Sequence, residues 1–189
     1  MNCRMHDSNA AIFTIGHSNH AIERFLDLLK RHAIEELADI RRFPGSRKHP
    51  HFNREGLQEA LDCQGIRYCW IEALGGRRKA AASGTSENLA WCNASFRNYA
   101  DYMASEEFRQ EVATLVQAAS ARRTAMMCAE GLWWQCHRRL VSDFLLAQVV
   151  RVEHIMPNGQ LKPHVMTPGA VVADGRVTYP APRTLFDGE

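Results

Sequence analysis

The sequence predicts an α/β fold with an open, mostly parallel sheet of about five strands and helices on both faces. Short apolar segments alternate along the chain with longer segments in which apolar residues recur at helical spacing. This alternation is typical of parallel strands joined by crossover helices. A chain of 189 residues is also long enough to bury a sizeable core. We therefore expect a single domain over residues 1–189, with its core at about 11–156 and a tail at 157–189.

The predicted strands are short apolar segments that end at glycine or polar residues. AIFTIG (11–16) is apolar with β-branched residues, and TAMMC (124–128) is a comparable apolar segment. After Pro157 the chain gains proline and glycine, which indicates a tail with a short hairpin or helical turn. We expect the five strands at 11–16, 34–40, 65–74, 124–128 and 150–155.

The predicted helices follow from periodicity and from capping residues. Ile22, Phe25 and Leu29 recur at helical spacing after the first strand. Asn53 is of the type that caps a helix N-terminus. We expect helices at 21–32, at 53–64, at 95–122 in two parts that meet near 104–105, and from about Gln135.

Composition indicates an ordinary globular protein. Charged residues make up 23% of the chain and apolar residues 46%, with a formal net charge of +2. No segment approaches the roughly 18 consecutive apolar residues that a membrane helix needs. The first 18 residues lack a cationic segment followed by a long apolar one, so we expect no signal peptide and a cytoplasmic protein. In that compartment most of the six cysteines are expected to be free thiols.

Arginine is far more frequent than lysine, with 19 arginines among the 23 basic residues. The planar guanidinium group binds phosphate and carboxylate through two parallel hydrogen bonds, which favours an anionic ligand. A genome rich in G and C explains the same bias without function. Both interpretations stay open, and the position of the arginines must decide between them.

The unusual residues cluster where the predicted strands end. In open parallel sheets, ligands bind beyond the carboxyl ends of the strands, at the point where the strand order reverses. The sequence therefore predicts one shared cleft of acidic, thiol and guanidinium groups at this edge. The relevant segments are 16–18, 39–42, 74–77 and 128–130.

The segment CAEGLWWQCHRR (128–139) holds the strongest candidates. Glu130 is a candidate general acid or base. Cys128 is the candidate catalytic thiol. Cys136 lies near a predicted helix N-terminus, which favours anions and lowers the pKa of a thiol. Cys136, His137 and Arg138 are expected to contact the substrate. In the alternative interpretation Cys128 is a core residue, and a pair between arginine and glutamate only fixes the loop.

The loop DIRRFPGSR (39–47) is the second candidate segment. Asp39 either orients Arg41 or acts as a second carboxylate beside Glu130. Arg41 and Arg47 are the expected anion contacts. A surface loop with salt bridges is the simpler alternative.

Residues after the first and third strands complete the predicted substrate site. His17 and Ser18 follow Gly16, whose missing side chain permits a close approach of the backbone. A structural role for His17 through hydrogen bonds is an equal alternative. A second pair of glycines with a following arginine is a weak signal of phosphate binding, at Gly75, Gly76 and Arg77.

These motifs together resemble a family of bacterial and archaeal proteins that is named for a domain of unknown function, DUF488. The resemblance covers residues 12 to 170 and implies an α/β fold and a shared pocket, while the activity of the family is not established. Family members usually carry a proline between CAE and CHR, where this chain has Trp133 and Trp134. The matching motifs are TIGHSN (14–19), DIRRFPGSR (39–47), LGGRR (74–78), FRNYADYM (96–103), MCAEGLWWQCHRRLVSDFL (127–145) and VEHI (152–155).

Three classes of function are consistent with these observations. The first is an enzyme, of a hydrolase or glycosyl-transfer type, that acts on a phosphate-bearing or other anionic small molecule, such as a nucleotide. The second is a nucleic-acid-binding module in which arginines follow the phosphate backbone and the two tryptophans stack on bases. The third is a protein with a thiol redox pair or a zinc site that uses Cys128 and Cys136. No cofactor or metal is predicted, zinc being the minority alternative, and no sequence signal indicates an oligomeric state.

Overall fold

The computed structural model describes residues 11–80 and 85–181. Its main sheet has six strands in the order β3-β2-β4-β1-β5-β6. The first five are parallel to one another and β6 is antiparallel to β5. The α/β class and the mostly parallel sheet are therefore confirmed, with one strand more than expected. The strands are β1 (Ala11–Gly16), β2 (Glu36–Asp39), β3 (Arg67–Trp70), β4 (Thr124–Cys128), β5 (Arg151–Ile155) and β6 (Leu161–Pro163).

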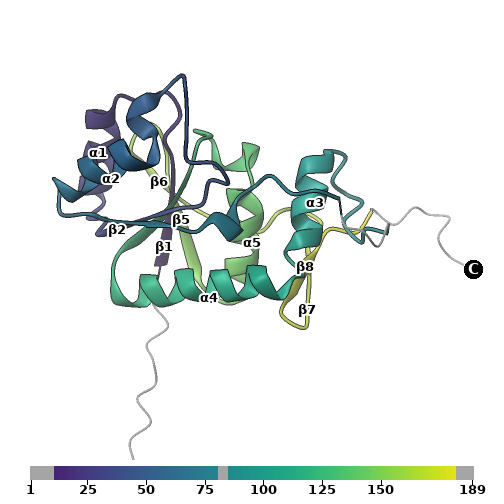
Figure 1. Ribbon diagram of the computed structural model, residues 1–189. Helices are drawn as coiled ribbons and strands as arrows, with labels where there is room; N and C mark the ends of the chain where they lie inside the picture. The colour runs from purple at the N-terminus through teal and green to yellow at the C-terminus, as the bar shows by residue number, and fades with distance from the viewer. Residues whose placement is uncertain (1–10, 81–84, 182–189) are drawn as a thin grey trace, which may run out of the picture.

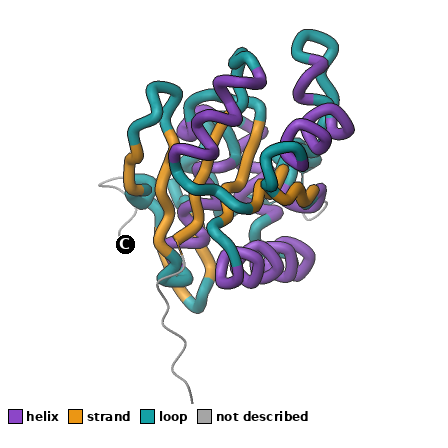
Figure 2. Tube along the Cα trace, turned by 90° about the vertical axis from the view of Figure 1, so that its left-hand side faces the viewer, coloured by secondary structure: helices purple, strands orange, loops and turns teal. Residues whose placement is uncertain are grey.

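Helices cover both faces of the sheet (Figure 1). They are α1 (Ile22–Arg31), α2 (Arg54–Asp62), α3 (Ala94–Tyr102), α4 (Glu106–Ala121) and α5 (Arg138–Ala147). The first two lie on one face and the other three on the opposite face. Figure 2 views the molecule from the side of α1 and α2. Side chains alternate along each strand, and consequently Phe13 packs toward α1 while Ile12 packs toward α4 and α5.

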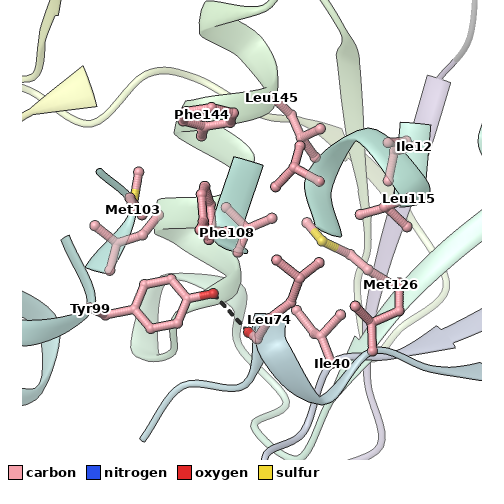
Figure 3. Packing of buried hydrophobic residues seen from close by; sticks show 14 of the residues in the cluster. Ile12, Ile40, Leu74, Tyr99, Met103, Phe108, Leu115, Met126, Phe144 and Leu145 are labelled. Carbon is pink, nitrogen blue, oxygen red and sulfur yellow. Dashed lines mark hydrogen bonds between the residues drawn. The ribbon is translucent and has the colours of Figure 1, made fainter. Parts of the chain in front are cut away.

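The larger of the two hydrophobic clusters lies between the sheet and helices α3, α4 and α5 (Figure 3). Phe108 and Phe144 meet edge to face, with ring centroids 5.0 Å apart. The Tyr99 hydroxyl is buried with them and donates a hydrogen bond of 2.7 Å to the carbonyl of Leu74. This bond ties α3 to the loop after β3, which borders the candidate site.

The start of one helix and the capping of another differ from the sequence prediction. The break in the long helical segment occurs as expected, and the side chain of Ser105 caps α4. However, α5 begins at Arg138 rather than at Gln135, because a short 3-10 helix at Trp133–Gln135 is followed by Cys136 in an extended conformation. Asn53 precedes α2 as expected, but its side-chain oxygen accepts from the backbone N–H of Ser46 instead of capping the helix.

The C-terminal segment forms the expected hairpin and also contributes to the core. Strands β7 (Val171–Ala173) and β8 (Arg176–Thr178) pair in antiparallel fashion. Val177 and Tyr179 are buried in the larger hydrophobic cluster. Residues 157–181 are therefore packed against α5 and β5 rather than lying apart from the core. Within the described residues, no helix is long and apolar enough to cross a membrane.

The strand order creates a switch point between β1 and β4. These strands are neighbours, but the chain leaves β1 toward β2 on one side and leaves β4 toward β5 on the other. The connecting helices α1 and α5 cover opposite faces. Loops that diverge in this way open a crevice at the carboxyl ends of the two strands. The sheet thus places the segments after Gly16 and Cys128 where ligands bind in such folds.

Candidate functional site

The ends of β1 and β4 are joined at the switch point. Gly16 pairs with Cys128 in the strand register. Beyond the strands the ladder continues, because His17 N–H donates to the Cys128 carbonyl at 3.0 Å and Ser18 N–H donates to the Ala129 carbonyl at 2.9 Å. The two loops therefore leave the sheet as one bonded unit.

Close backbone contacts hold these loops together. A Cβ atom at Gly16 would collide with the carbonyl oxygen of Glu130, so only glycine fits there. Gly131 lies against the side chain of Ser18, whose backbone adopts a left-handed conformation with φ of 49°. The sequence prediction that glycine permits close approach after the first strand agrees with this geometry.

The sulfur atoms of Cys128 and Cys136 lie 3.1 Å apart. Cys136 Sγ also accepts from Arg138, through the backbone N–H at 3.4 Å and through Nε at 3.2 Å. The guanidinium group donates further to the carbonyl of Glu130. Arg138 is 1% exposed, so a full positive charge lies inside the protein directly beside a thiol. Both cysteines are buried and neither is in a disulfide.

The two thiols differ in acidity. Burial raises the pKa of Cys128, and its hydrogen bond to Cys136 raises it further. Burial also acts to raise the pKa of Cys136, but the Cys128 hydrogen bond and the positive charge of Arg138 outweigh it and hold this pKa well below its ordinary value. These shifts favour the thiolate form of Cys136 and the protonated form of Cys128, with the Cys128 thiol as the donor between the two sulfur atoms.

His137 joins this site to the loops after β2 and β3. Its Nε2 lies 3.0 Å from the carbonyl of Ile40 and donates to it, and burial lowers the pKa of the ring. The His137 ring also packs against Gly76, where a Cβ atom would lie 2.5 Å from Nδ1 of His137. Gly75 packs equally closely on the backbone of Arg42. Both glycines thus permit packing between loops.

Asp39 and Arg41 form a buried ion pair at the end of β2. Nε and Nη2 of Arg41 donate to the carboxylate, with a shortest distance of 2.6 Å. The Tyr68 hydroxyl donates to the same carboxylate at 2.8 Å. Nη1 of Arg41 donates to the carbonyl of Phe52 at 2.9 Å and lies 3.3 Å from Nε2 of His17. Asp39 therefore orients Arg41, and the pair neutralises its own charge inside the fold.

His17 is held as a neutral imidazole. Its Nδ1 donates to the carbonyl of Ser18 at 2.9 Å, which leaves Nε2 free to accept from Arg41. The ring stacks on Phe52 with centroids 4.3 Å apart. Burial and the neighbouring Arg41 charge lower the pKa of His17 to about 4. These contacts are those of a residue that joins β1 to the loop after β2.

Three of the predicted site residues are exposed at this edge. The side chains of Arg47, Arg77 and Glu130 face solvent. Arg77 follows Gly76 directly and so lies beside the His137 contact. The structure brings the predicted residues from all four strand ends to one edge, but it buries Arg41 and Arg138 in internal pairs and leaves the other two arginines on the surface.

The sequence profile described as "Domain of unknown function DUF488" matches residues 21–145. This match covers more than half of the chain. The chain belongs to the DUF488 family. No curated protein and no solved structure matches it. The family match includes β2, β3, β4 and most of α5, and hence the thiol pair and the Asp39–Arg41 pair of this DUF488 protein.

A group of aromatic and histidine side chains beside the thiols is not evident from the sequence. Trp133 stacks flat on His154, with ring centroids 4.2 Å apart and an interplanar angle of 7°. In the sequence, His154 stands out only as part of the motif VEHI (152–155), and neither His164 nor Asp143 belongs to a recognisable site pattern. No local motif identifies them, because they come together only through the packing of β5, α5 and the C-terminal segment.

In the part of this DUF488 protein that the structure describes, the edge with the thiols holds neither a metal-ligand cluster nor one of the two cavities. Within residues 11–80 and 85–181, no group of three or more His, Cys, Asp or Glu side chains is arranged to hold a metal ion. A cavity of about 490 Å³ borders Asp174 and Arg176 of the hairpin, and one of about 310 Å³ borders Asp101 of α3. Neither Cys128 nor Cys136 lines these cavities.

Proposed function

We propose that this DUF488 protein is a thiol–disulfide exchange enzyme in which Cys136 is the nucleophile and Cys128 the second thiol. One observation supports it above all others. The two sulfur atoms lie 3.1 Å apart, and the buried guanidinium group of Arg138 contacts Cys136, which lowers the pKa of that thiol while burial raises the pKa of Cys128. A thiolate is the form of cysteine that attacks a disulfide.

The proposed reaction proceeds in two steps. The Cys136 thiolate attacks a small disulfide, forming a mixed disulfide and releasing one thiolate. Cys128 then loses its proton and attacks Sγ of Cys136, which forms the Cys128–Cys136 disulfide and releases the second small thiol. Two protein thiols are oxidised as one external disulfide is reduced, and two equivalents of a small thiol reverse the change. The sulfurs need to approach by only about 1 Å to reach the bonded distance of about 2.05 Å.

Arg138 has the central electrostatic role in this proposal. Its guanidinium group is almost fully buried and contacts Cys136 directly, so the positive charge stabilises the thiolate before reaction. Once the disulfide forms, that negative charge is lost and Arg138 keeps only its bond to the Glu130 carbonyl. The buried charge thus favours the reduced form of the protein.

Exposed basic residues at the same edge favour an anionic disulfide. Arg77 follows the glycine that packs on His137, the residue next to Cys136. Arg47 and Lys48 are exposed on the loop after β2. An anionic substrate is also expected from the sequence, and in this proposal the surface arginines, rather than the buried Arg41, recognise it.

Proton transfer by Glu130 is the competing proposal. The Glu130 carboxylate is exposed, and it is the backbone carbonyl of this residue that accepts a hydrogen bond from Arg138. Glu130→Gln separates the two proposals. If the thiolate carries the chemistry, this variant keeps the exchange rate within about twofold, whereas a general acid or base contributes about 100-fold or more.

The function is tested with the reduced protein and oxidised glutathione, an anionic disulfide. We expect a disulfide between Cys128 and Cys136, located by peptide mass spectrometry, and the release of reduced glutathione. Bis(2-hydroxyethyl) disulfide, which is neutral, serves as the comparison and is expected to react more slowly. Arg77→Ala should reduce the difference in rate between oxidised glutathione and this neutral disulfide. Failure to form this disulfide with either reagent would refute the proposal.

A further inference from the structure

A continuous chain of buried hydrogen bonds runs beside the thiol pair. The Thr14 hydroxyl lies 2.7 Å from Nδ1 of His154, and Nε2 of His154 lies 3.0 Å from Nδ1 of His164. Nε2 of His164 lies 2.8 Å from a carboxylate oxygen of Asp143. The other carboxylate oxygen accepts from the Tyr179 hydroxyl at 2.7 Å. We call Thr14, His154, His164 and Asp143 the histidine relay.

The relay consists of residues from four separate segments. Thr14 lies in β1, Asp143 in α5, His154 in β5 and His164 directly after β6. All four are buried. Both histidines lie outside residues 21–145, the part that the family profile matches. The C-terminal part of this chain therefore adds buried polar groups to the region of the thiols.

The hydrogen bonds fix the orientation of both rings. With Asp143 as a carboxylate, Nε2 of His164 donates to it and Nδ1 of His164 accepts from His154. Nδ1 of His154 then accepts from the hydroxyl of Thr14. Each ring nitrogen has one partner in this assignment, which follows from the network. Because the alternatives leave a buried polar atom unpaired, the His154 ring is held in one plane.

Trp133 connects the relay to the thiols. Its ring stacks on the fixed plane of His154 and meets the His164 ring edge to face, with centroids 5.2 Å apart. Its carbonyl oxygen accepts from the backbone N–H of Cys136 at 3.4 Å and lies 3.8 Å from the Sγ atom of the same residue. Trp133 thus contacts His154 with its side chain and Cys136 with its backbone.

We propose that His154 and His164 are positioning residues for Cys136, and that they act through Trp133. The relay fixes the platform on which the indole stacks, and the stacked indole holds the loop over the thiolate. Cys136 is 7% exposed, so a reagent reaches its sulfur only when this loop moves. The inference rests on the proposed function for its substrate, but its test measures access to Cys136 and needs no turnover.

The test is the rate at which iodoacetamide alkylates Cys136, measured by peptide mass spectrometry on the folded protein. Trp133→Ala is expected to raise this rate about tenfold, while Trp133→Phe, which retains an aromatic ring, stays within about threefold. His164→Gln is expected to raise the rate about fivefold in the wild-type background. In the Trp133→Ala background the same substitution should add less than about twofold, because its effect passes through the indole.

Two variants at Thr14 change the shape of the core less than the substitutions above, so that loss of folding does not obscure the result. Thr14→Val removes the hydroxyl at the end of the relay with little change in shape, and Thr14→Ser keeps it. We expect faster alkylation of Cys136 in Thr14→Val alone, with circular dichroism confirming that both variants fold. The proposal would be overturned if His164→Gln raised the alkylation rate by the same factor in the wild-type and the Trp133→Ala proteins. It would also be overturned if Trp133→Ala left the rate unchanged. Absence of glutathione exchange with an intact pattern of alkylation would instead refute only the proposed function.

Discussion

The ring of His137 lies directly against the backbone of Gly76. The contact is tight enough that a Cβ atom at position 76 would come within 2.5 Å of the ring. His137 in turn bonds to the carbonyl of Ile40 and precedes Arg138. One residue next to the thiolate therefore joins the loops after β2 and β3 to the start of α5.

Gly76→Ala is expected to destabilise the protein by about 1 to 3 kcal/mol, since overpacking forces the ring or the loop to shift. Gly45→Ala is the matched control, because nothing lies within 4 Å of a Cβ atom at that position. The control should change the free energy of unfolding by less than about 0.5 kcal/mol. Urea unfolding measures both, and equal effects would contradict the packing argument.

Asp39→Asn tests the buried ion pair. The substitution leaves the guanidinium group of Arg41 buried without a counter-charge, and we expect a loss of about 3 to 5 kcal/mol in the free energy of unfolding. The partly exposed pair of Arg42 and Glu72, 3.2 Å apart, provides the control. Glu72→Gln should cost less than about 1 kcal/mol. A small effect of Asp39→Asn would show that Arg41 is not dependent on its partner.

His17 predicts a particular dependence of stability on pH. Its pKa is lowered to about 4 in the folded protein from an ordinary value of 6.5. Between these values the unfolded chain binds the proton and the folded protein does not, so stability falls as pH falls, with a slope of up to about 1.4 kcal/mol per pH unit from this group. His17→Phe, which retains an aromatic ring against Phe52, should remove this contribution and reduce the slope by up to about 1.4 kcal/mol per pH unit. An unchanged slope would contradict the assignment.

Arg138 predicts the pH profile of Cys136. Because the pKa of Cys136 is held below its ordinary value, alkylation of this thiol should persist at pH values where a free cysteine is protonated and slow. Arg138→Met removes the charge and should move the midpoint of the profile to higher pH. Arg138→Lys keeps a cation and should move it less. If the midpoint is the same in all three proteins, the charge of Arg138 does not set the acidity of the thiol.

The sequence predicted the architecture because apolar periodicity and strand order carry most of that information. The α/β class, the division between α3 and α4 and the convergence of strand ends agree with the structure. β6 was missed because Leu161–Pro163 is a short, exposed edge strand without an apolar pattern. The start of α5 was placed too early because Cys136 is extended, a conformation that its bonds to Arg138 favour and that no propensity indicates.

The chemistry of the site was less accessible from sequence. A cluster of arginines indicates positive charge, but it does not show that Arg41 pairs with Asp39 or that Arg138 pairs with a thiol. The separation of eight residues between Cys128 and Cys136 gave no strong redox signal, whereas the turn at Trp133 brings the sulfurs into contact. The histidine relay depends on contacts between distant segments, and these follow only from the fold.

The central claim is that Cys136 attacks and Cys128 resolves. The most direct test is to mix Cys128→Ser and Cys136→Ser separately with oxidised glutathione and to identify the modified peptide by mass spectrometry. We predict that Cys128→Ser accumulates a mixed disulfide with glutathione at Cys136, and that Cys136→Ser forms none at Cys128. A mixed disulfide at Cys128 in the second variant, or none at Cys136 in the first, would contradict the account.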